Sequence, residues 1–111
     1  MTIYALSSGS GISGIAVIRI SGENTKKIIT SLISGNLPSP RLAALKKFNK
    51  INTSELIDEG ILIWFPGPES YTGEDMAEIH VHGSKAVIDA LHSNISKIKN
   101  CRLAEPGEFT K

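Results

Sequence analysis

The feature that most constrains the fold is the way the spacing of apolar residues changes along the chain. Residues 76–82 alternate between apolar and polar, which is the two-residue period of a strand buried on one face. In residues 23–34 and 84–99 the apolar residues recur every three or four positions, as in a helix with one buried face. A chain that switches between these two periods predicts helices packed against a sheet.

Five further strands are predicted from their apolar and β-branched content, at residues 3–6, 15–20, 42–48, 56–65 and 102–104. From Ile61 onwards the fourth of these is apolar on both faces, so we expect it in the interior of the sheet. The element order is two strands, a helix, three strands, a helix and a strand. Because 111 residues leave room for one domain, we expect an α+β fold over residues 1–111, with both helices on one face of a mixed sheet.

Composition and charge narrow the classes of function. Twelve basic and eleven acidic residues give a net charge of +1, without the basic excess of a domain that grips a nucleic-acid backbone. No apolar run approaches the ~20 residues that span a bilayer, so no membrane partner is expected. Cys101 is the single cysteine, which excludes an intrachain disulfide and favours the cytoplasm.

Three glycines, at positions 9, 11 and 14, have the spacing of a dinucleotide-binding fingerprint. That fingerprint requires a helix after the third glycine, whereas residues 15–20 predict a strand. We therefore expect no Rossmann fold, and interpret the segment as an inter-strand loop that closes over a ligand. The chain has no phosphate-binding G-x-x-x-x-G-K-[ST] motif, so we expect no catalytic residues for nucleotide hydrolysis.

Polar residues of the predicted strand 76–82 provide a candidate site. Glu78, His80 and His82 share one strand face and so form a possible set of three metal ligands, although a fourth ligand must come from elsewhere. In the competing interpretation, the two histidines have a structural role or orient a bound ligand, and they do not bind a metal. Arg19 interrupts the apolar strand 15–20 and requires an anion, which is either a protein carboxylate or a ligand carboxylate.

Three segments together resemble the amino-terminal domain of the tRNA-modifying GTPase MnmE (TrmE) family: GISGIAVIRISG at 11–22, DEGILIWFPGPESYTGEDMAEIHVHG at 58–83 and RLAEPGEFTK at 102–111. The chain departs from the family pattern at two places. Its glycine loop reads SSGSGISG where the family usually carries proline and arginine, and His80 replaces a small polar or amide residue. The second departure counts against a metal site.

The resemblance implies a binding domain for a reduced folate, of the 5-formyltetrahydrofolate type, that also forms a homodimer. By position in the motif, Glu78 accepts the donor pair of the pterin ring and Arg19 binds an anionic or carbonyl group of the ligand. Further folate-binding positions implied by the motif are Tyr71, Thr72, Gly73 and His82.

The resemblance also implies that the chain is a fragment, because it stops at GEFTK, in the middle of a motif that continues in the family. The complete protein is expected to add a helical domain and a GTPase domain that holds GTP, Mg²⁺ and K⁺. With an MnmG-type flavoprotein it would modify C5 of the wobble uridine of tRNA by an aminomethyl-type group, and the fragment alone would not be an enzyme. The alternatives are a folate-binding module of an aminomethyltransferase-like protein and a metal-binding module built on Glu78, His80 and His82.

Overall fold

A computed structural model describes residues 1–7, 14–68, 70 and 73–110. Along the chain its elements are β1 (Thr2–Leu6), β2 (Ile15–Ser21), α1 (Thr25–Leu32), β3 (Ala44–Asn49), β4 (Leu56–Phe65), β5 (Met76–His82), α2 (Lys85–Ile95), β6 (Cys101–Leu103) and the 3₁₀ helix η1 (Glu108–Thr110). This order confirms the predicted α+β class. None of the helices described has the length and apolar character needed to cross a membrane.

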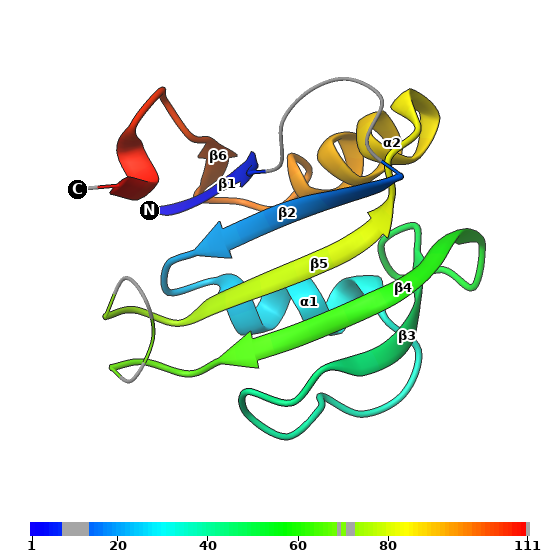
Figure 1. The fold of residues 1–111 in the computed structure, drawn as a ribbon, viewed down its shortest axis with the longest axis horizontal. Helices are drawn as coiled ribbons and strands as arrows, with labels where there is room; N and C mark the ends of the chain where they lie inside the picture. Colours follow the sequence, from blue (N-terminus) through cyan, green and yellow to red (C-terminus); the bar gives the residue numbers. More distant parts are fainter. Residues whose placement is uncertain (8–13, 69, 71–72, 111) are drawn as a thin grey trace.

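The strands form one mixed sheet in the order β3-β4-β5-β2-β1-β6 (Figure 1). Neighbouring strands are antiparallel except β1 and β6, which are parallel. As predicted from its two apolar faces, β4 lies inside the sheet, between β3 and β5. The pairing of β2 with β5 brings together segments about sixty residues apart, and this pairing positions the candidate site.

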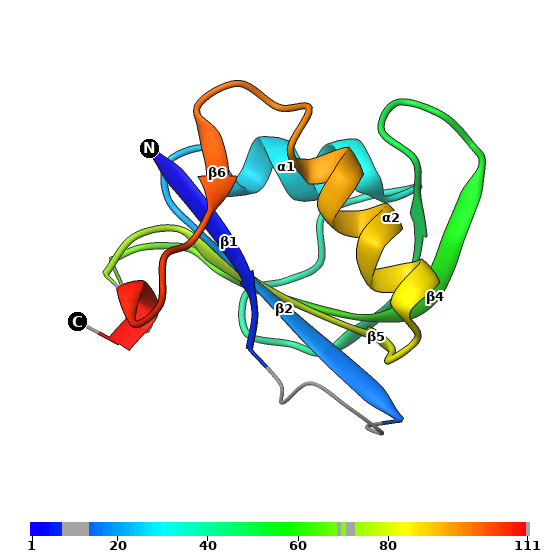
Figure 2. The ribbon, with the colours of Figure 1, turned by 90° about the horizontal axis from the view of Figure 1, so that it is seen from above.

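Both helices cover the same face of the sheet (Figure 2), where the hydrophobic core lies. Ile18, Leu62 and Ile79 from the sheet meet Ile28 and Leu91 from the helices, and all five are fully buried. Their burial follows from the two periods, because alternate strand residues and every third or fourth helix residue point to the same side. At ~25 cal/mol per Å² of apolar surface, this burial is the main stabilising contribution.

The helix boundaries differ from prediction at the second helix, which ends at Ile95 and not near residue 99. It begins as expected, with the Ser84 hydroxyl accepting a hydrogen bond from the Val87 amide at 3.2 Å. Residues 96–100 form turns, in which Ile98 still packs into the core. The predicted helix was too long because the buried Ile98 continues the helical spacing of apolar residues, although its backbone lies in a turn.

Neither α1 nor α2 covers the other face of the sheet, which we call the open face (Figure 2). Exposed apolar side chains lie on it, with Ile15 58% and Leu45 66% exposed. The register of β2 with β5 places Arg19 and Glu78 opposite each other on this face, and His80 follows two residues along β5. The open face therefore carries the polar groups that the alternation of residues 76–82 predicted.

Candidate functional site

Arg19 and Glu78, the two principal residues of the predicted site, form an ion pair on the open face. Arg19 Nε donates to Glu78 Oε2 at 3.0 Å, with side-chain exposures of 35% and 17% respectively. The contact arises because the two residues are register partners on β2 and β5. The sequence left the anion partner of Arg19 open between protein and ligand, and the structure provides a protein carboxylate.

His80 contacts the other oxygen of the same carboxylate. Its Nε2 lies 3.1 Å from Glu78 Oε1, so the two oxygens of Glu78 are engaged by different side chains. Since an ionised carboxylate only accepts hydrogen bonds, this contact assigns the proton to Nε2 of His80. Arg19, Glu78 and His80 thus form a continuous polar chain, which we call the open-face triad.

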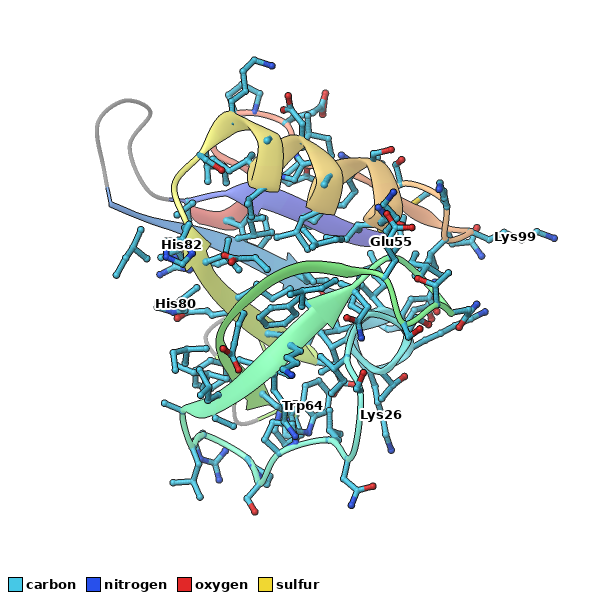
Figure 3. All side chains as sticks on the ribbon, turned by 90° about the vertical axis from the view of Figure 1, so that its right-hand side faces the viewer. Lys26, Glu55, Trp64, His80, His82 and Lys99 are labelled. Carbon is cyan, nitrogen blue, oxygen red and sulfur yellow. The ribbon has the colours of Figure 1, made fainter. Side chains whose placement is uncertain are left out.

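His82 belongs to a separate polar contact, although it lies close to His80 along β5 (Figure 3). Its backbone amide donates to Asp58 Oδ2 at 2.9 Å, and its ring Nδ1 lies 2.9 Å from the same oxygen. Burial opposes the charge on Asp58, but these hydrogen bonds outweigh that cost and lower the pKa of the carboxyl. The His82 side chain is itself 75% exposed.

The predicted metal-ligand set does not converge. His80 is directed to Glu78 and His82 to Asp58. Within residues 1–7, 14–68, 70 and 73–110, no group of three or more His, Cys, Asp or Glu side chains is placed to hold a metal ion. The geometry therefore gives the metal-binding alternative no support.

A cavity of about 380 Å³ lies beside Arg19, within the range of about 300–1,000 Å³ typical of small-molecule sites. It is lined by Ala5, Leu6, Ser7, Arg19, Ala104, Glu105, Pro106, Gly107, Glu108 and Phe109. Glu78 is not among these lining residues and joins the cavity through its contact with Arg19. The open-face triad therefore borders the cavity at Arg19.

Residues 104–109 form one wall of this cavity. The sequence pattern did not predict this position. The segment is anchored to β1 by the Ala104 amide, which donates to the Tyr4 carbonyl at 2.8 Å. Glu108 holds it further by accepting from Arg102 and, at 2.8 Å, from the Glu105 amide. The Pro-Gly pair at 106–107 indicated a turn, but nothing local indicated that the turn would fold back over β1.

The loop between β4 and β5 contains the remaining predicted positions. Tyr71 and Thr72 lie outside the residues that the structure describes. Gly73 is exposed with φ of +82°, which favours glycine, and it is not among the residues lining the Arg19 cavity. The ends of the loop are joined where the Gly67 amide donates to Asp75 Oδ1 at 2.9 Å. Asp75 therefore binds a backbone group of its own loop.

Cys101 is a partly buried thiol at the edge of the sheet. Burial raises the pKa of its thiol to about 11, so almost no thiolate is present at neutral pH. The residue lies on β6 and packs against the core. We therefore assign it a packing role.

Fold and site together define the class of protein: an α+β domain whose open sheet face carries a charged cluster next to a cavity of ligand size. The model of the family described as the GTP-binding protein TrmE N-terminus matches residues 2–111. The chain belongs to this family, which confirms the resemblance found in the three sequence segments.

Curated relatives match over the whole chain or nearly so. A tRNA modification GTPase MnmE from Pelagibacter ubique is 76% identical over 111 residues, which are 100% of this chain and 25% of the relative. One from Brucella anthropi is 49% identical, with 99% and 24% of the two chains covered. A mitochondrial 5-taurinomethyluridine tRNA synthase subunit from Danio rerio is 46% identical, with 99% and 22% covered. The chain therefore spans about a quarter of the length of these relatives.

Proposed function

We propose that this chain binds a reduced folate of the 5-formyltetrahydrofolate type and forms a homodimer. The observation that carries the proposal is the ion pair of Arg19 with Glu78 at 3.0 Å, next to a cavity of about 380 Å³. Had these side chains lain on remote surfaces, no single ligand would contact both. Their adjacency is what recognition of a pterin conjugate by an acid and a guanidinium requires.

The chemistry of each group fits a part of the ligand. A pterin presents a ring N–H beside an exocyclic amine, and a carboxylate accepts such a pair through its two oxygens. Glu78 has one lone pair on each oxygen beyond those used by Arg19 and His80. The Arg19 guanidinium borders the cavity, where an anionic or carbonyl group of the ligand would meet it.

Calorimetric titration of the protein with 5-formyltetrahydrofolate tests this assignment. We expect Glu78→Gln and Arg19→Gln each to weaken binding by about tenfold, since each removes a charge-assisted hydrogen bond. Lys47→Gln is the matched control. Lys47, the register partner of Glu59, is also a charged residue on the open face, but it lies on the edge strand β3, which β4 separates from β5. Affinity unchanged in Glu78→Gln would remove Glu78 from the site.

The apolar part of the open face supports the homodimer. Leu45 on β3 and Ile15 on β2 are more than half exposed, and Ile61 and Ile63 on β4, next to β3, are half-buried. Exposed apolar side chains gathered on one face are typical of a protein interface. A second copy of the chain would bury these side chains next to the open-face triad.

Sedimentation velocity tests the homodimer. We expect the wild-type chain to sediment as a dimer and Leu45→Glu as a monomer, because the substitution places a charge within the apolar surface. Leu103→Glu is the control. Leu103 is also exposed, by 54%, but it is the register partner of the core residue Tyr4 and therefore lies on the opposite face of the sheet from Leu45. A dimer that persists in Leu45→Glu and dissociates in Leu103→Glu would locate the interface elsewhere.

We propose further that the chain acts as the amino-terminal part of a cytoplasmic tRNA modification GTPase. The names of the bacterial relatives and the family match support this role, and favour it over an aminomethyltransferase-like module. GTP, Mg²⁺ and K⁺ would bind to a GTPase domain outside this chain, and a flavoprotein of the MnmG type and tRNA would be its partners. Complementation of a strain lacking the corresponding gene by the complete protein, with wild-type or Glu78→Gln sequence, tests this role.

A further inference from the structure

The carboxylate of Glu78 is held from two sides before any ligand arrives. Arg19 reaches Oε2 from the neighbouring strand β2, and His80 reaches Oε1 from the same strand β5. Glu78 is also the least exposed member of the open-face triad. Two contacts on two different oxygens fix both the position and the plane of the carboxylate, whereas one contact would leave it free to rotate.

A fixed plane matters for the proposed function, because a pair of parallel N–H donors needs both oxygens in one orientation. Long side chains such as glutamate lose considerable rotamer freedom when ordered, and a carboxylate that is already ordered does not lose it on binding. Of the two groups that order Glu78, Arg19 also borders the cavity. The contribution of Arg19 to orientation therefore cannot be separated from direct contact with a ligand.

His80 is placed differently. It is not among the residues that line the Arg19 cavity, and it borders instead a hollow of about 190 Å³ together with Glu59 and His82. Directly across the sheet its register partners are Ile61 on β4 and Val17 on β2, which offer it no charged group. Its contact with Glu78 is therefore the route by which the imidazole can influence the cavity.

We infer that His80 is a positioning residue for ligand recognition: it orients the Glu78 carboxylate by donating a hydrogen bond from Nε2. This inference rests on the proposed function, in which Glu78 accepts the donor pair of the ligand. It assigns to His80 a role that depends on a hydrogen-bond donor at that position and on nothing else about the imidazole.

Titration calorimetry with 5-formyltetrahydrofolate on a set of His80 and Glu78 variants tests the inference. His80→Phe keeps a ring but removes the donor, and we expect it to weaken binding about tenfold. His80→Gln restores a donor, and we expect it to stay within about threefold of wild type. In a Glu78→Gln background, His80→Phe should have no further effect, because the two residues act as one unit.

The outcomes separate this inference from the proposed function. Weak binding in Glu78→Gln combined with normal binding in His80→Phe would overturn the role of His80 alone. An equal loss from His80→Phe in both backgrounds would also overturn it, since His80 would then act without Glu78. Normal binding in Glu78→Gln, or no binding by wild type, would overturn the proposed function and this inference together. Thermal unfolding checks each variant, and His80→Met replaces His80→Phe if the latter does not fold.

Discussion

At the scale of single residues, His92 shows how the interior of this fold treats a titratable group. Its ring packs edge-on against Tyr4, with centroids 5.4 Å apart. Among the described residues, its Nε2 is the one buried side-chain nitrogen or oxygen without a hydrogen-bond partner. Burial lowers the pKa of His92, against the weaker opposing effect of the Asp89 charge.

The shift makes stability depend on pH in a definite direction. Between the unfolded value of 6.5 and the lower folded pKa of His92, the unfolded chain binds the proton more readily. We therefore expect the free energy of unfolding to fall as the pH drops below about 6.5, measured by urea denaturation. His92→Phe, which keeps the ring contact with Tyr4, should flatten this dependence, and the exposed neighbour Ser93→Ala should not.

A second acid effect should appear at lower pH. Because the folded pKa of Asp58 is lowered, its stabilising contribution is present above its ordinary value of 3.8 and is lost as the pH falls through the folded value. The window for His92 begins higher, at about pH 6.5. A His92 ring that titrates at or above 6.5 by NMR would contradict the assignment of its burial effect.

At the scale of elements, the segment 104–109 acts as one wall of the cavity and depends on a few anchors. Arg102 and Glu108 form a two-pronged ion pair, and Glu108 also accepts from the Glu105 amide. These groups are partly exposed, so their contribution to global stability is small. Their effect on the position of the segment 104–109 is larger, because few described contacts hold this segment in place.

We expect Glu108→Ala to release the segment without unfolding the domain. Hydrogen exchange of the Ala104 amide, which is bonded to the Tyr4 carbonyl, should accelerate severalfold, because the segment opens more often. Glu105→Ala is the control within the same segment, because its described hydrogen bonds involve only its backbone. Equal acceleration in both variants would mean that the Glu108 side chain is not the anchor.

At the scale of the whole molecule, the order of strands predicts how stability is distributed. β2 and β5 lie in the interior of the sheet, bonded on both sides, and their inward residues are fully buried. β6 is a three-residue edge strand, and β3 forms the other edge. Protection should therefore be greatest in the middle of the sheet and least at its edges.

Hydrogen exchange at several protein concentrations measures this distribution. We expect the amides of Ile18 and Ile79 to exchange only on global unfolding, and those of Cys101–Leu103 to exchange by local opening, orders of magnitude faster. Protection of the two regions by a similar factor at all concentrations would contradict the edge assignment of β6.

The elements of this fold could be predicted because their signals are local. The alternation in 76–82 identified the buried residues Ala77, Ile79 and Val81 and, on the opposite face, the polar residues that form the site. Helical spacing likewise identified Ile28 and Leu32 as buried. Glycine at position 60 is a counterexample: a Cβ there would lie 2.0 Å from the His80 carbonyl oxygen, and no local pattern indicated this close approach.

The sequence by itself determined the class of fold, the face on which Glu78 and His80 lie, and the family to which the chain belongs. Only the tertiary structure decided that Arg19 meets Glu78, that Asp58 rather than Glu78 is the partner of His82, and that residues 104–109 close the cavity. The physical reason is the range of the forces involved. Periodicity depends on neighbours within a turn or a strand, whereas strand order depends on how all the apolar faces are buried at once.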